Sequence, residues 1–216
     1  MQRGKVVTTL LLLVAASLSA QQLPVTKPNL KWLQNEVDHL HELDSKNAVG
    51  VVPGLTVEER RELIRSFEKD LRPSMKELSI GSEEELRKAV AENTLVEKID
   101  LDGDGIPEVI VQGVGNIWGS SPTGNGPIWV LKKTPKSYRA LINSLGQHFT
   151  VLEAKTNGFF DLMIGMHGSA TLQELKIYRF RDGRYFKDGC FEANWSVLVD
   201  GEVRDLRKPL ITKCGS

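Results

Sequence analysis

The spacing of apolar residues changes part-way along the chain, and this change predicts two structural regions. Leu30, Leu33, Val37 and Leu40 recur at helical spacing, which predicts a first amphipathic helix that ends near Leu43. Residues 21–28 carry two prolines and no period, so they predict an irregular leader before this helix.

Two capping patterns predict further helices. Thr56 with Glu59 and Ser82 with Glu85 match the box in which a hydroxyl residue precedes a glutamate by three positions. The helix that follows Thr56 ends before Pro73, and its apolar face consists of Leu63, Ile64, Phe67 and Leu71.

From Leu95 onward, short runs rich in strand-forming residues alternate with turn residues. Asp182-Gly183 and Asp200-Gly201 are typical of tight hairpin turns. We therefore predict an α+β fold, with a helical region over 21–93 and an antiparallel β-rich domain over 94–216. The predicted strands are 95–99, 108–111, 128–131, 138–142, 149–152, 162–166, 172–180 and 185–191.

The predicted strands divide into two similar halves. Residues 104–111 align with 157–164 at an offset of 53 positions, and Tyr138 falls opposite Tyr185 at an offset of 47. These offsets indicate two blade-like pseudo-repeats, about 95–145 and 149–193, followed by a C-terminal tail. Since two blades cannot close a ring, we expect a sandwich-like or partial-propeller packing that the N-terminal helices cover.

An acidic loop, residues 100–108, is the strongest chemical signal in the chain. It reads Asp-Leu-Asp-Gly-Asp-Gly-Ile-Pro-Glu, with carboxylates at positions 1, 3, 5 and 9 and Gly105 at position 6. Clustered carboxylates repel one another unless a cation screens them, and calcium prefers such oxygen ligands. We predict one structural calcium ion; the alternative is a plain turn. In the second pseudo-repeat Lys155 replaces an acid, so no metal is expected there.

The acidic loop and the Val-Ile-Val that follows it resemble the calcium loop of the FG-GAP or VCBS repeats, the integrin-type blades of exported bacterial proteins. The resemblance implies a loop between two strands that holds calcium through acidic side chains and one carbonyl. By position, the implied ligands are Asp100, Asp102, Asp104, the carbonyl of Ile106 and Glu108. The close match covers about a dozen residues, and the whole chain is similar to uncharacterised exported bacterial proteins.

The first twenty residues have the pattern of a secretory signal peptide. Arg3 and Lys5 precede an apolar stretch over 6–16, and small residues follow before Gln21. A retained N-terminal anchor is the alternative. Export to a secreted or periplasmic location favours a disulfide between Cys190 and Cys214, although two buried thiols are also consistent with the sequence.

The charge balance argues against a nucleic-acid partner. Removal of residues 1–20 leaves 26 basic residues against 28 acidic ones, a net charge of −2. A nearly neutral chain has no broad attraction to nucleic acid or to anionic lipid, so we expect no stable membrane insertion after signal cleavage.

No catalytic motif accompanies the acidic loop, so we predict an exported, calcium-binding, non-enzymatic module whose partner is a protein or a carbohydrate. The glycine-rich loop 113–127 contains Trp118, which either stacks on a ligand or folds back against the sheet. The alternative function is a secreted hydrolase whose site includes this loop and His167. His167 and Ser169 share a strand face, but the chain has no nucleophile elbow.

Overall fold

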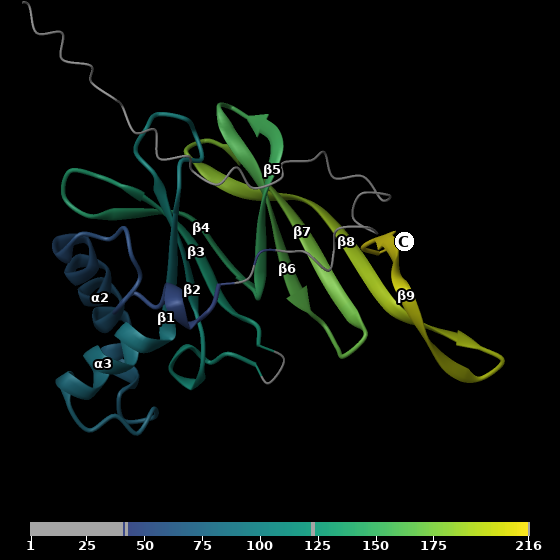
Figure 1. The fold of residues 1–216 in the computed structure, drawn as a ribbon, viewed down its shortest axis with the longest axis horizontal. Helices are drawn as coiled ribbons and strands as arrows, with labels where there is room; N and C mark the ends of the chain where they lie inside the picture. Colours follow the sequence, from purple (N-terminus) through teal and green to yellow (C-terminus); the bar gives the residue numbers. More distant parts are fainter. Residues whose placement is uncertain (1–40, 42, 122–123, 216) are drawn as a thin grey trace, which may run out of the picture.

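A computed structural model of the chain describes residues 41, 43–121 and 124–215. In this part of the chain, two α-helices precede two antiparallel sheets (Figure 1). None of the helices in it is long and apolar enough to cross a membrane. The predicted signal peptide, the leader and most of the first predicted helix lie outside the described residues. The end of that helix is wrong, because His41 forms an extended bridge with Phe149 and a short 3-10 turn, η2, covers Ser45–Asn47.

The two helices begin at the predicted capping residues. Helix α2 spans Val57–Leu71, and both halves of its capping box are formed between Thr56 and Glu59. The 3-10 turn η3, Arg72–Ser74, ends it at the predicted proline. Helix α3 spans Glu83–Asn93 and is capped by the Ser82 side chain. Its box is only half formed, because the Glu85 carboxylate accepts from the N–H of Gly81.

Each sheet is a meander in which consecutive strands are neighbours. The strands of the first sheet are β1 (Thr94–Ile99), β2 (Glu108–Gly113), β3 (Gly126–Lys133) and β4 (Tyr138–Gly146). Those of the second are β5 (His148–Thr156), β6 (Phe159–His167), β7 (Leu172–Arg181), β8 (Arg184–Val199) and β9 (Glu202–Lys213). All eight predicted strands lie within these bounds. The predicted C-terminal tail is instead a ninth strand, which the Asp200-Gly201 turn directs back along β8.

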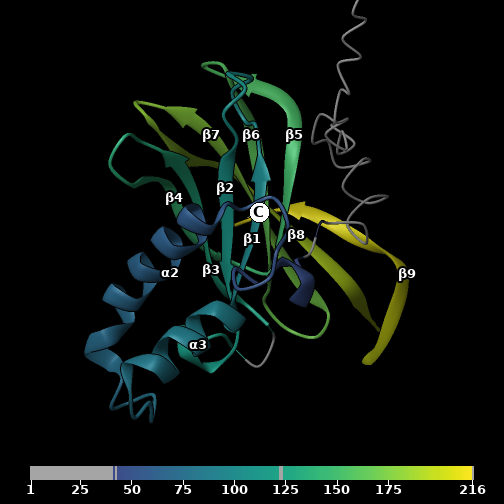
Figure 2. The ribbon, with the colours of Figure 1, turned by 60° about the vertical axis from the view of Figure 1, so that its left-hand side comes forward.

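The first sheet is buried on both of its faces. Successive side chains of a strand point to opposite faces. Val109 and Val111 therefore pack with Leu63 of α2 and Leu86 of α3 in one cluster, whereas Ile110 packs toward the second sheet in another. Figure 2 shows the two helices lying against the first sheet only. The helices thus cover one sheet, and the second sheet covers its other face.

Both sheets contain a β-bulge at the same place in their third ladder. Between β3 and β4 the register shifts after Val130, which leaves Leu141 of β4 as the extra residue. Between β7 and β8 it shifts after Ile177, which leaves Asp188 of β8 extra. A bulge bends its strand and increases the local twist, so the two sheets curl at equivalent positions.

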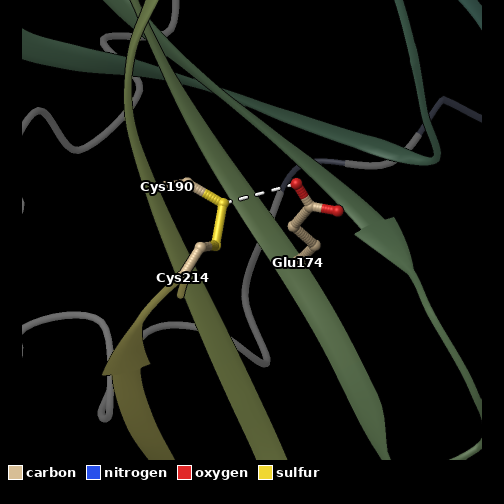
Figure 3. Close-up of side chains that lie close together, drawn as sticks. All are labelled: Glu174, Cys190 and Cys214. Carbon is tan, nitrogen blue, oxygen red and sulfur yellow. Dashed lines mark hydrogen bonds between the residues drawn. A yellow bond between two sulfur atoms is a disulfide. The ribbon is translucent and has the colours of Figure 1, made fainter. Parts of the chain in front are cut away.

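A disulfide joins β8 to the end of β9, as the sequence predicts. Cys190 and Cys214 are bonded, with their Cα atoms 5.3 Å apart. The Cys190 Sγ also lies 3.3 Å from a carboxylate oxygen of Glu174 on β7 (Figure 3). A disulfide sulfur has no proton to donate to this carboxylate. The positive partner of Glu174 is Lys176, whose Nζ lies 3.7 Å from a Glu174 oxygen.

Candidate cation-binding site

The acidic loop connects β1 to β2, and its own aspartates fold it. The carboxylate of Asp100 accepts hydrogen bonds from the N–H groups of Gly103 at 2.8 Å and Gly105 at 3.0 Å. Both glycines have positive φ, 80° and 83°, a conformation that disfavours other residues. Asp102 accepts from the N–H of Asp104. The loop is therefore a tight coil that turns its carboxylates inward.

Glu108 forms the floor of the site. Its side chain is completely buried at the start of β2, and its Oε2 accepts the N–H of Leu101 at 2.9 Å. Burial raises the pKa of Glu108, while the hydrogen bond from the Lys132 ammonium acts in the opposite direction. Burying an ionised carboxylate in this position without a positive partner would cost a large free energy.

Three of the five predicted ligand residues come together directly. Asp100, Asp102 and Glu108 each offer a carboxylate oxygen, and these atoms all lie within 4.8 Å of one another. Asp104 lies at the rim with its side chain 40% exposed. The N–H of Ile106 donates to the Asp104 carboxylate at 2.7 Å, and the Ile106 side chain points into solvent. The loop thus has the oxygen-rich donor set that a hard cation requires.

Lys132 of β3 supplies the positive charge, and sequence reasoning missed it. Its Nζ donates to Asp102 at 2.5 Å and to Asp104 at 3.0 Å. It also donates to Glu108 at 2.9 Å. Although burial acts to lower the pKa of Lys132, the three carboxylate hydrogen bonds raise it above its ordinary value. The ammonium is also 5.3 Å from the centre of the Phe159 ring of the second sheet.

The strand register explains why Lys132 reaches the loop. Val109 of β2 is the direct partner of Leu131 of β3, so the next positions, Glu108 and Lys132, face each other across the strands. A predicted pairing of β2 with β3 in this register was the signal that could have identified Lys132.

One ammonium balances only one of four carboxylate charges, which leaves the site with a net charge of about −3 if all four acids are ionised.

The equivalent turn of the second sheet is built differently. Asn157 and Gly158 form a two-residue turn there, and the Lys155 ammonium lies 4.0 Å from the centre of the Phe160 ring. Asp161, which aligns with Glu108, is also buried, and the Arg179 guanidinium lies 3.3 Å from its Oδ2. The second sheet therefore also pairs a buried carboxylate with a base, but here the base is half exposed and has a second aspartate, Asp188, as a partner.

Trp118 folds back into the protein. Its ring lies 5.3 Å from that of Phe67 on α2 and 5.2 Å from that of Trp129 on β3, measured between centroids. Its Nε1 donates to the buried Thr94 hydroxyl at 3.2 Å. Of the two predicted roles of Trp118, the structure shows the packing role, with the ring partly buried against α2 and β3.

Beside the glycine-rich loop lies a polar pocket of about 390 Å³. Its described lining consists of Leu43, Gln112, Val114, Gly115, Asn116, Ser120, Ser121, Gly124 and Gln147, none of which is ionisable. The Nε2 of Gln112 donates to the Gln147 carbonyl at 3.1 Å. The pocket therefore offers hydrogen bonds, and its described lining contains no acid or base.

His167 and Ser169 form hydrogen bonds with other residues. The backbone N–H and C=O of His167 bond to the Asn125 side chain, and the Ser169 hydroxyl accepts the N–H of Thr171. Among the described residues, no hydrogen bond joins the His167 ring to Ser169.

Comparisons with known protein families, curated proteins and solved structures yield no match to this chain. The resemblance of the acidic loop to an FG-GAP or VCBS repeat remains a prediction from its own residues.

Proposed function

We propose that this protein is an exported, non-enzymatic binding module that the acidic loop stabilises by holding calcium. The ligands would be Asp100, Asp102, Asp104, the carbonyl of Ile106 and Glu108. One observation carries the proposal: carboxylate oxygens of Asp100, Asp102 and Glu108 lie within 4.8 Å of one another. Such convergence is unfavourable without a cation, and one ammonium offsets only a quarter of the formal charge.

Lys132 has a defined role in this proposal. Its ammonium donates hydrogen bonds to Asp102, Asp104 and Glu108 and would stabilise the loop before calcium binds. A calcium ion would displace it, since both cations use the same oxygens of Asp102, Asp104 and Glu108. The Lys132 side chain is long and 22% exposed, so it can turn toward solvent. Calcium affinity would then fall in the weak range of extracellular sites, about 10⁻⁴ to 10⁻³ M.

The two sheets, we also propose, are copies of one blade-like unit. Glu108 and Asp161 are 53 positions apart, and their basic partners Lys132 and Arg179 are 47 apart. The bulges after Val130 and after Ile177 share that second offset. Bulges and buried ion pairs are specific features, so their agreement favours duplication over chance.

A hydrolase is the less favoured alternative. An enzyme of that kind needs a nucleophile, a base and an orienting acid within hydrogen-bond reach. The polar pocket beside the glycine-rich loop has a described lining of amides, hydroxyls and aliphatic groups. Such a lining suits recognition of a polar ligand, such as a carbohydrate, better than acid–base chemistry.

A calcium titration followed by thermal melting tests the cation site. At a concentration roughly ten times the dissociation constant, calcium should raise the melting temperature by about 3–5 °C. Asp102→Asn and Asp104→Asn should each reduce this shift strongly, because each removes an anionic ligand. Asp200→Asn, which changes an exposed acid in the β8–β9 turn at the far end of the second sheet, is the matched control and should respond like the wild type.

Lys132→Gln separates the calcium proposal from a plain ionic turn. Without calcium this variant should melt lower than the wild type, because its carboxylates lose their ammonium. It should bind calcium more tightly, by about tenfold or more, since removing a unit positive charge about 8 Å from a divalent ion is worth about 1–4 kcal/mol at an effective dielectric of about 80 to 20. If neither the wild type nor Lys132→Gln responds to calcium, the loop is a turn neutralised by lysine and the proposal fails.

A further inference from the structure

The tip of the β8–β9 hairpin extends beyond the second sheet (Figure 1). Strand β7 pairs with β8 only as far as Asn194, whereas β9 pairs with β8 to its end at Val199. The last residues of β8 and the first of β9 therefore form a two-stranded ribbon. Such a ribbon is marginally stable by itself in water, and the outer edge of β9 has no neighbouring strand among the described residues.

The ribbon carries an exposed apolar pair. Leu198 and Val203 are 72% and 71% exposed and are direct partners in the β8–β9 ladder, so their side chains lie together on one face. Exposed apolar side chains at an open strand edge favour pairing with another chain.

The hairpin turn determines which backbone groups of β9 point outward. Asp200 and Gly201 both have positive φ, 54° and 82°, as a two-residue type I′ turn requires. In such a turn the flanking residues, Val199 and Glu202, form the hydrogen-bonded pair that closes the hairpin. Because the pattern alternates, the N–H and C=O of Val203 point away from β8 and are available to a second strand.

The sequence around Val203 is complementary to itself. If two β9 edges pair antiparallel about a two-fold axis, Val203 faces Val203 of the second copy. Glu202 then faces Arg204 of the second copy, and the same pair forms again by symmetry. These ion pairs fall at non-hydrogen-bonded positions, where facing side chains are closest. The exposed Leu198–Val203 pair would also become an apolar row of four residues across both copies.

We propose that the occupant of this edge is a second copy of the same chain, and that the protein forms a two-fold symmetric dimer through β9, centred on Val203. The match of charge with opposite charge and of apolar with apolar residue identifies the partner, because an unrelated strand has no reason to repeat it. The contact is small, so the dimer is weak and is populated at roughly 10 µM to 1 mM protein.

Sedimentation equilibrium over this concentration range, on protein purified after expression of the full coding sequence, tests the proposal. The wild type should shift from monomer to dimer. Val203→Pro removes the outward N–H and no bond to β8, because proline is tolerated on an edge strand where its nitrogen faces solvent. This variant should remain monomeric while its melting temperature, measured on dilute monomer, stays at the wild-type value.

Charge exchange tests the register. Glu202→Arg places two arginines opposite each other, and Arg204→Glu places two glutamates opposite each other, so each variant alone should weaken dimerisation at least about fivefold. A one-to-one mixture of the two variants should restore a heterodimer, because every facing pair again has opposite charges. A purely structural role for these side chains could not produce this recovery.

A wild type that stays monomeric to about 1 mM overturns the proposal, since even the weakest specific dimer of this size should appear there. Dimerisation that survives Val203→Pro also overturns it, because the contact then lies elsewhere. If the mixture of charge variants fails to dimerise, the proposed register is wrong and the edge belongs to another extended segment.

Discussion

Each sheet pairs a buried carboxylate with a basic side chain of the neighbouring strand, but the two pairs have different surroundings. In the first sheet Glu108 and Lys132 meet at the acidic loop, which adds Asp100, Asp102 and Asp104. In the second sheet Asp161 faces Arg179, which also contacts Asp188 at 2.7 Å. The ion pair by itself is therefore a structural element of this strand arrangement. In the first sheet, the three aspartates add the oxygen ligands that make it a candidate cation site.

The sheets also differ in what stabilises them. The first has an ionic centre in its β1–β2 loop, and the second has a covalent bond between its last two strands. An ionic centre responds to charge and metal, whereas a disulfide responds to reductant. Changes to the acidic loop and changes to the disulfide should therefore affect the stability of the protein independently.

The largest expected effect comes from removing the disulfide of the second sheet. Replacing both Cys190 and Cys214 by serine removes a covalent link between residues that are 24 positions apart in sequence. This change should lower the free energy of unfolding by about 3 kcal/mol. Urea unfolding measures this change. Calcium affinity should stay within about twofold of the wild type, because the disulfide and the acidic loop lie in different sheets. A loss of calcium binding in this variant would show that the two regions are not independent.

A smaller effect should distinguish the two ion pairs. Glu108→Gln removes the anionic partner of Lys132 at a completely buried position and should reduce the free energy of unfolding by about 2–3 kcal/mol. Asp161→Asn is the matched change in the second sheet. It should have an effect of about 1 kcal/mol, because Arg179 is half exposed and keeps Asp188 as a partner. Equal losses in the two variants would contradict a special role for the acidic loop.

The smallest effect concerns the connection between the sheets. His41 bridges Phe149 of β5, and its Nε2 lies 2.5 Å from a Glu97 oxygen on β1. The hydrogen bond to Glu97 raises the pKa of His41 above its ordinary value of 6.5. A raised folded-state pKa contributes stability that is complete below 6.5 and is lost as the pH rises through the folded value.

His41→Gln measures this contribution. The wild type should exceed the variant by less than about 1 kcal/mol at about pH 5.5, and the difference should shrink by about pH 8.5. Urea unfolding at the two pH values provides the comparison. A difference that grows with pH would mean that the neutral imidazole makes the stabilising contact.

Local sequence patterns predicted most of the elements. Thr56 and Ser82 begin helices because their hydroxyls satisfy free N–H groups of the first turn. The Asp200-Gly201 turn was also predicted, but strand β9 was not, because its many charged residues hide the alternation that marks a buried strand. The helix expected to end near Leu43 fails at His41, where contact with another strand outweighs local propensity.

The sequence by itself determined where α2 and α3 begin, where most of the strands lie and where acids cluster, because these depend on neighbours along the chain. Only the tertiary structure decided what balances the acids. Lys132 reaches the loop because β2 and β3 pair in one register, and Trp118 is half-buried because it packs against Phe67 of α2 and Trp129 of β3. Such contacts join residues far apart in sequence, and their energies depend on burial and distance, which no local pattern specifies.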